Sequence, residues 1–126
     1  MQPPDRTTRT WRSKFRDAFR GVKTGVRGQS SFFVHFFMAA LVVAAGAVLG
    51  VTRVEWCLLL LAIFGVLAAE MFNSALEWLA KAITDEHDPN VGQALDIGSA
   101  AVLTASLGAA SIGLLVFVPR LLVMLD

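Results

Sequence analysis

Three polar side chains interrupt an otherwise apolar stretch of the chain, and their types suit chemistry on a hydroxyl group. They are Glu70, Asn73 and Glu77, in the segment EMFNSALE. At about 100° per residue of an α-helix the three fall within about 60° of one another, so two carboxylates and an amide form one stripe. Ionisable groups inside an apolar span are costly unless they are paired or hydrated. Both glutamates are therefore candidate functional residues.

The stripe is compatible with three kinds of chemistry. One carboxylate can act as a general base while the other holds a metal ion, the two can relay protons, or the stripe can form a polar seam between helices. Phosphoryl transfer requires an activated hydroxyl and a divalent ion on the phosphate oxygens, and the stripe could supply both. The sequence has neither a G-x-x-x-x-G-K-S/T loop nor a kinase-type G-x-G-x-x-G, so a nucleotide site here would be of an uncommon type.

The composition is that of a membrane protein. Of the 126 residues, 56% are hydrophobic and only 17% are charged, whereas soluble domains carry more charge. The single cysteine, Cys57, lies in an apolar run, which excludes an intrachain disulfide and a cysteine-based metal site. We therefore expect an all-α integral membrane domain over residues 11–126, preceded by a disordered lead-in at residues 1–10.

Three transmembrane helices are expected to position the stripe, at about residues 32–52, 56–81 and 97–119. The first contains one ionisable group, His35, and about 20 helical residues cross a ~30 Å hydrocarbon layer. The second carries the stripe toward its end. A charged connection follows over residues 84–96, and we expect the third span to stop at Pro119, because proline interrupts helical hydrogen bonding.

A basic amphipathic helix is predicted over residues 11–27. Apolar residues recur there at spacings of three and four, with Arg and Lys between them, which is typical of a helix lying on a membrane surface. Such a segment beside membrane spans favours anionic lipid headgroups over nucleic acid as its partner. The same positive charge places the N-terminus in the cytoplasm, and three crossings then place residues 84–96 in the cytoplasm and the C-terminus outside.

The segment EMFNSALE is followed eighteen residues after Glu77 by DIGSAAVL, from Asp96 to Leu103. The two blocks together resemble the signature of the bacterial integral-membrane diacylglycerol kinase and undecaprenol kinase family. The resemblance covers roughly residues 11–118. It implies a homotrimer in the bacterial inner membrane that uses ATP and Mg²⁺ to phosphorylate a membrane lipid, with each site between subunits at the cytoplasmic interface.

The resemblance also implies roles for individual residues. Glu70 would be the general base that takes the proton of the lipid hydroxyl, and Glu77 would bind the magnesium ion together with Gln29, which stands where the family has a second metal-binding Glu. The lipid side of the site would include Asn73 as an orienting group and Ser99. The expected nucleotide contacts are Glu86, His87, Asp88 and Asp96.

Several positions depart from the family pattern. Besides Gln29, a nearby Arg of the family is Phe33 here, the Lys before the aspartate is Leu95, and Lys81 replaces an Asp. These departures favour, as the alternative, a catalytically degenerate relative that binds lipid or has a structural role. His35 matches the form seen in undecaprenol-kinase-like members. A proton relay across the bilayer is the third reading, and it is disfavoured because the polar line does not continue along the spans.

Overall fold

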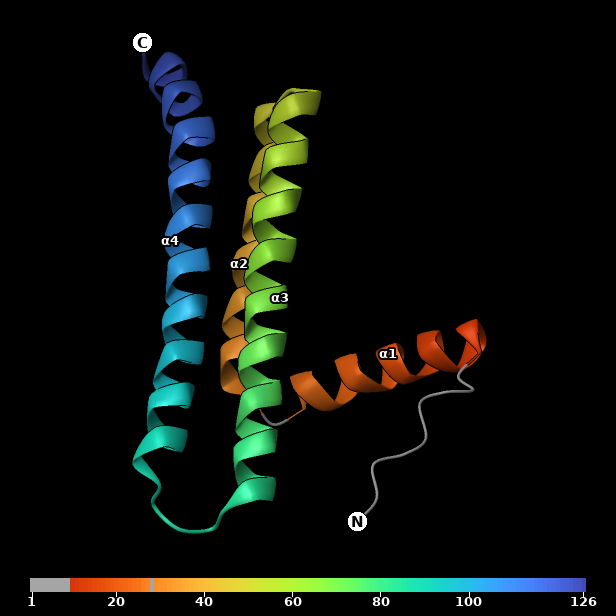
Figure 1. Ribbon diagram of the computed structural model, residues 1–126. Helices are drawn as coiled ribbons and strands as arrows, with labels where there is room; N and C mark the ends of the chain where they lie inside the picture. The colour runs from red at the N-terminus through yellow and green to blue at the C-terminus, as the bar shows by residue number, and fades with distance from the viewer. Residues whose placement is uncertain (1–9, 28) are drawn as a thin grey trace.

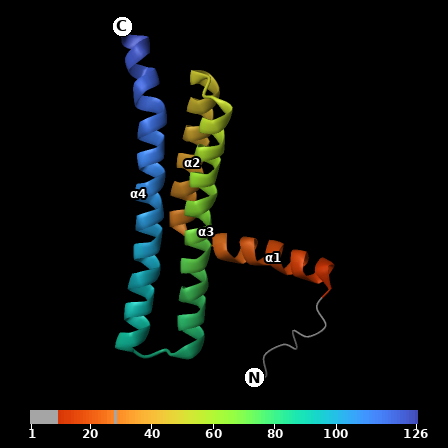
Figure 2. The same ribbon diagram turned by 45° about the horizontal axis from the view of Figure 1, so that its top comes forward.

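The computed structural model describes residues 10–27 and 29–126, and every regular element in this part of the chain is an α-helix. The four helices are α1 (Trp11–Val26), α2 (Ser30–Leu49), α3 (Arg53–Ile83) and α4 (Pro89–Leu125). The long helices α2, α3 and α4 run side by side, and α1 projects sideways from them (Figures 1 and 2). The predicted lead-in lies outside the described residues, except for its last residue.

The three long helices are each long and apolar enough to cross a membrane. A small core of Val51, Leu59 and Val116 holds them together, but most of their large apolar side chains are exposed, as with Phe64 at 66% and Leu115 at 77%. Such a surface requires lipid or neighbouring protein around it. The predicted class, an all-α membrane protein with three spans and an additional N-terminal helix, is confirmed.

The helix that contains the third span begins earlier than the sequence suggested, because Pro89 starts a helix instead of lying within the connection. Proline suits the first position of a helix, where its missing N–H is not needed. Asp88 caps this helix, since its Oδ1 accepts hydrogen bonds from the backbone N–H groups of Asn90 at 2.8 Å and Val91 at 3.2 Å. The connection between α3 and α4 therefore comprises only residues 84–88, and the first two turns of α4 extend beside the end of α3.

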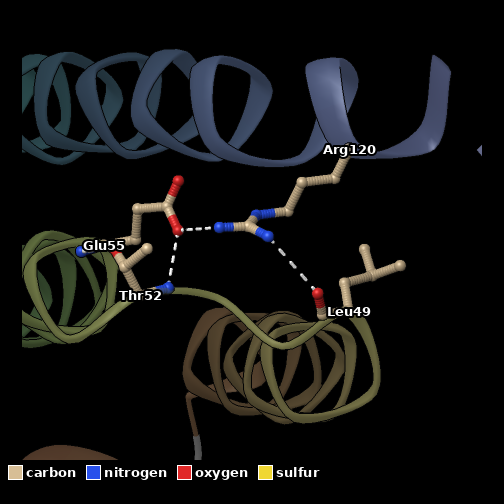
Figure 3. Close-up of polar contacts among 4 residues, drawn as sticks. All are labelled: Leu49, Thr52, Glu55 and Arg120. Carbon is tan, nitrogen blue, oxygen red and sulfur yellow. Dashed lines mark hydrogen bonds and ion pairs between the residues drawn. The ribbon is translucent and has the colours of Figure 1, made fainter. Parts of the chain in front are cut away.

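The expected stop at Pro119 was wrong, because α4 continues through this residue to Leu125. Arg120, directly after the proline, is held at this level by contacts with both neighbouring helices (Figure 3). Its guanidinium forms an ion pair with Glu55 and donates to the carbonyl oxygen of Leu49 at 3.5 Å. Proline is tolerated in membrane helices where neighbouring groups compensate for the local loss of backbone bonding.

Near Arg120, the end of α2 and the start of α3 are each stabilised by a local cap. Gly50, with φ at 61°, ends α2 in the left-handed conformation that glycine adopts without strain. Thr52 and Glu55 then form a capping box at the start of α3, in which the Glu55 carboxylate accepts the Thr52 backbone N–H at 2.7 Å. This cluster ties α2, α3 and α4 together at the end of the molecule far from Glu70.

The N-terminal helix α1 meets α3 at a glycine. A Cβ atom on Gly25 would lie 2.9 Å from Sδ of Met71, so the close approach of the two helices depends on this residue. Met71 directly follows Glu70 in the sequence, so the end of α1 packs next to the buried stripe on α3. The apolar side chains Trp11, Phe15 and Phe19 of α1 are between 62% and 76% exposed, as the membrane-surface prediction requires.

Candidate active site

The buried carboxylate of Glu70 is the centre of the site. The residue is 3% exposed, and both of its carboxylate oxygens are hydrogen-bonded to side chains of α2. His35 Nε2 lies 2.8 Å from Oε1, and Ser31 Oγ donates to Oε2 at 3.3 Å. Ser31 and His35 are four residues apart, so they lie on one face of α2 and meet α3 together. Both glutamate oxygens are thereby satisfied inside an apolar bundle.

The second carboxylate, Glu77, is also held by hydrogen bonds from side chains, about two helical turns farther along α3. Gln29 Nε2 donates to its Oε2 at 2.8 Å, and Asn73 Nδ2 donates to its Oε1 at 3.0 Å. Gln29 is the N-cap residue of α2, but its side chain makes no capping bond and turns to Glu77 instead. The segment that starts α2 thus provides partners for both carboxylates of the stripe.

Asn73 lies where α4 packs tightly against α3. Its Oδ1 is buried and has no hydrogen-bond partner among the described residues. A Cβ on Gly98 would lie 2.7 Å from this oxygen and 2.9 Å from Cδ1 of Leu76. Only a glycine at position 98 therefore allows α4 to pack here without displacing Asn73. Ser74 beside it is also buried, and its hydroxyl likewise lacks a partner in the described part of the chain.

An open pocket of about 470 Å³ lies beyond Glu77, between the end of α3 and the start of α4. Its walls contain one cation, Lys81, and most of the residues predicted to contact nucleotide. Glu86 and His87 are exposed on the connecting segment, whereas the Asp88 carboxylate is engaged in capping α4. The other lining residues are Glu77, Ala80, Thr84, Val91, Gly92, Leu95 and Ser99.

Two predicted site residues on α4, Ser99 and Asp96, differ in their position relative to the pocket. Ser99 lines the pocket, and its hydroxyl donates to the backbone carbonyl of Leu95 at 3.1 Å. Asp96 is exposed and does not line the pocket. Within one chain, the structure therefore brings Glu70, Asn73, Glu77 and Gln29 together, and places Asp96 apart from them.

Two site residues, Ser31 and His35, were not among the predicted ones. The only signal in the sequence was the single ionisable side chain in the first span, because a histidine in an apolar helix requires a polar partner. That partner, Glu70, lies 35 residues away. Spacing within one helix could not identify it.

The residues around Glu77 fit a magnesium ion brought in with a nucleotide. Among the described residues, no group of three His, Cys, Asp or Glu side chains is placed to hold a metal ion. Magnesium, however, keeps several waters and is usually bound through one or two carboxylates together with substrate phosphates. Glu77 offers a carboxylate, and Gln29 offers an amide oxygen if its amide turns over from the present N–H bond.

Comparison with known proteins identifies the family. The model of the prokaryotic diacylglycerol kinase family matches residues 16–117. The undecaprenol kinase of Bacillus subtilis is 33% identical over 107 residues, which cover 85% of this chain and 87% of that protein. The diacylglycerol kinase of Haemophilus influenzae is 31% identical over 88 residues, 70% of this chain and 75% of that protein. No solved structure matches the chain significantly. The family predicted from EMFNSALE and DIGSAAVL is confirmed.

Proposed function

Because this chain belongs to the prokaryotic diacylglycerol kinase family, and is thereby a membrane lipid kinase, we propose that it transfers the γ-phosphoryl group of ATP to the hydroxyl of a membrane lipid. The observation that carries the proposal is the buried Glu70 carboxylate, with a second, more accessible carboxylate, Glu77, about two helical turns along the same face of α3. Two acidic groups held at different depths suit a reaction that joins a lipid hydroxyl to a charged phosphate.

Glu70 is the general base in this proposal. Its carboxylate accepts the proton of the lipid hydroxyl as the hydroxyl oxygen forms its bond to the γ-phosphorus. The bond between that phosphorus and the bridging oxygen breaks, its electron pair leaves with ADP, and the lipid phosphate is formed. The buried position of Glu70 suits a lipid headgroup, since an acceptor in the bilayer can reach it without leaving the membrane surface.

Glu77 belongs to the nucleotide side of the site. It lies seven residues, about two helical turns, nearer the end of α3, and it lines the open pocket with Lys81. We place the ATP phosphates in this pocket, where Lys81 supplies positive charge. Glu77 and Gln29 would hold the magnesium ion, which neutralises charge on the phosphate oxygens when bound. Asn73 orients Glu77 by its hydrogen bond to Oε1.

We assign the remaining contacts from the resemblance. Ser99, on the pocket wall, would contact the lipid, and Glu86, His87 and Asp88 would contact the nucleotide. Asp96 is exposed in one chain, and its assigned role requires a site completed by a neighbouring subunit. A homotrimer, with the N-terminus and the pocket on the cytoplasmic side of a bacterial inner membrane, meets this requirement.

Undecaprenol is the acceptor that we favour over diacylglycerol. His35 is the form found in undecaprenol-kinase-like members, and the match to the undecaprenol kinase of Bacillus subtilis covers more of the chain than the match to the diacylglycerol kinase. Initial rates of phosphate transfer from labelled ATP to each lipid, measured with the purified protein in mixed micelles, test this choice. A kcat/KM at least about tenfold higher for diacylglycerol would overturn the preference, since tenfold corresponds to about 1.4 kcal/mol of transition-state stabilisation.

One observation favours the degenerate alternative. The Gln29 amide already donates to Glu77 at 2.8 Å, so this carboxylate is stabilised by hydrogen bonding without a metal ion. A protein that binds neither nucleotide nor magnesium, while it remains folded and binds lipid, would support that alternative.

A further inference from the structure

The contact between His35 and Glu70 joins two helices at the depth of the proposed general base. His35 Nε2 lies 2.8 Å from Glu70 Oε1, and the side chains are 20% and 4% exposed. An ionised carboxylate can only accept hydrogen bonds, so Nε2 carries the proton of this contact when Glu70 is ionised. Hydrogen bonds with an ionised partner are shorter and stronger than neutral ones. The contact therefore fixes one particular oxygen of Glu70.

The other oxygen of Glu70 is held less firmly. Ser31 Oγ donates to Oε2 at 3.3 Å, beyond the usual range of about 2.5–3.0 Å for O–H···O bonds. A second hydroxyl that approached Oε2 more closely would displace this long bond at little cost. The two oxygens thus differ in availability, because Oε1 is occupied by a short bond and Oε2 by a long one.

We propose that His35 is a positioning residue for phosphoryl transfer, which holds Oε1 of Glu70 so that Oε2 receives the proton of the lipid hydroxyl. This inference rests on the proposed function, in which Glu70 is the general base. The lipid hydroxyl takes the place of Ser31 at Oε2, and its proton moves to that oxygen while the Nε2–H bond of His35 stays intact. His35 itself exchanges no proton in this step.

No other described side chain of this cluster can hold Oε1 of Glu70 during the reaction. The other ionisable side chain of the stripe, Glu77, is bound by Gln29 and Asn73. The remaining partner of Glu70 is the Ser31 hydroxyl, which occupies the oxygen needed for the reaction. Once the lipid hydroxyl has displaced Ser31, the His35 bond is the one from α2 that still restricts rotation about the side-chain bonds of Glu70.

A matched pair of variants separates the hydrogen bond from the packing. Glutamine and methionine have similar unbranched shapes, but only glutamine has an amide that can donate to a carboxylate. The protein already contains such a bond, because the Gln29 amide donates to Glu77 at 2.8 Å. His35→Gln can therefore restore a donor to Oε1, whereas His35→Met fills similar space without one.

The experiment measures kcat and both KM values for phosphate transfer from ATP to undecaprenol, using the wild type and the two variants in mixed micelles. Loss of a hydrogen bond to a charged group should lower kcat of His35→Met by about ten- to hundredfold. The KM for lipid and for ATP should stay close to the wild-type values, because neither substrate is bound by His35. His35→Gln should recover most of the lost kcat.

Two results would overturn the inference. In the first, kcat of His35→Gln falls as far as that of His35→Met while both proteins have wild-type thermal stability and oligomeric state. In the second, the variants raise the KM for lipid and leave kcat unchanged, which would make His35 a lipid contact. Failure of the proposed function is distinguishable from both, since it would appear as a wild-type protein with no transfer to undecaprenol or diacylglycerol.

Discussion

At the scale of single residues, the site is organised by pairs of side chains that join α2 to α3. Glu70 pairs with His35, and Glu77 pairs with Gln29. The departures from the family pattern have a structural consequence at Gln29 in particular. Where a second carboxylate would repel Glu77 unless a cation lay between them, the neutral amide of Gln29 forms a hydrogen bond with it.

Replacement of Gln29 by glutamate should make the protein dependent on magnesium for stability. In Gln29→Glu the bond to Glu77 is replaced by a carboxylate pair, which is unfavourable until a cation is bound. We expect a lower Tm than wild type in the absence of divalent ions, and a larger rise in Tm on addition of Mg²⁺, since the variant has one more anionic ligand. Thermal unfolding in detergent with increasing MgCl₂ measures both.

The same unfolding series contains its own control. Addition of NaCl at matched ionic strength should screen the carboxylate pair only weakly, because both groups are partly buried. Equal Mg²⁺-induced shifts in wild type and Gln29→Glu would mean that Gln29 does not face a metal site.

The stripe of Glu70, Asn73 and Glu77 could be predicted because it depends on the period of one helix. Their partners could not, because His35 and Gln29 lie 35 and 48 residues away along the chain from Glu70 and Glu77. Such contacts depend on how α2 packs against α3. Helical period carries no information about that packing.

At the scale of elements, the close approach of α4 to α3 at Gly98 positions the stripe. The two helices extend together past the level of α1 and form the walls of the pocket (Figure 1). The sequence indicated all four helices. It did not indicate that Pro89 begins a helix or that α4 continues through Pro119, because the effect of a proline depends on its capping partner and on neighbours such as Arg120.

A single methyl group at Gly98 should disturb Asn73. The Cβ of Gly98→Ala would lie 2.7 Å from Asn73 Oδ1, so Asn73 or α4 must shift, and the bond to Glu77 weakens. Overpacking of this kind costs about 1–3 kcal/mol, and we expect a lower Tm and a higher magnesium requirement. Gly108→Ala is the matched control on the same helix, since a Cβ there would meet nothing within 4 Å.

The result for the control is also defined. An alanine in open helical surroundings should leave the Tm unchanged or raise it slightly, because alanine is the better helix former. If Gly98→Ala behaves like Gly108→Ala in both stability and magnesium requirement, the close contact at Asn73 has no functional importance.

At the scale of the whole molecule, most of the large apolar side chains of the three long helices remain exposed among the described residues. Lipid or neighbouring protein must cover them. A ladder of small residues on α4, formed by Ala101, Ala105, Ala109 and Gly113, permits close helix approach. A Cβ on Gly113 would meet nothing within 4 Å in one chain, so this end of the ladder is open to a neighbour.

The orientation in the membrane determines whether the pocket can receive ATP. We expect a cysteine at position 85, on the exposed segment after α3, to face the cytoplasm, because the basic residues of α1 hold the N-terminal side there. In a Cys57→Ser background, Asp85→Cys should react with a membrane-impermeant thiol reagent only after the membrane is permeabilised. Reaction in intact cells would contradict the proposed topology.

The most direct test of the account is phosphate transfer from labelled ATP to undecaprenol by the wild type and by Glu70→Gln, each purified and shown to have the same Tm and oligomeric state. The amide cannot accept the proton of the lipid hydroxyl, so we expect kcat of Glu70→Gln to fall by about 10²–10⁴, the usual contribution of a general base. ATP binding should be unaffected, because Glu77 and the pocket are unchanged. Transfer by Glu70→Gln at the wild-type rate would contradict the account, since the buried carboxylate at its centre would then have no part in the reaction.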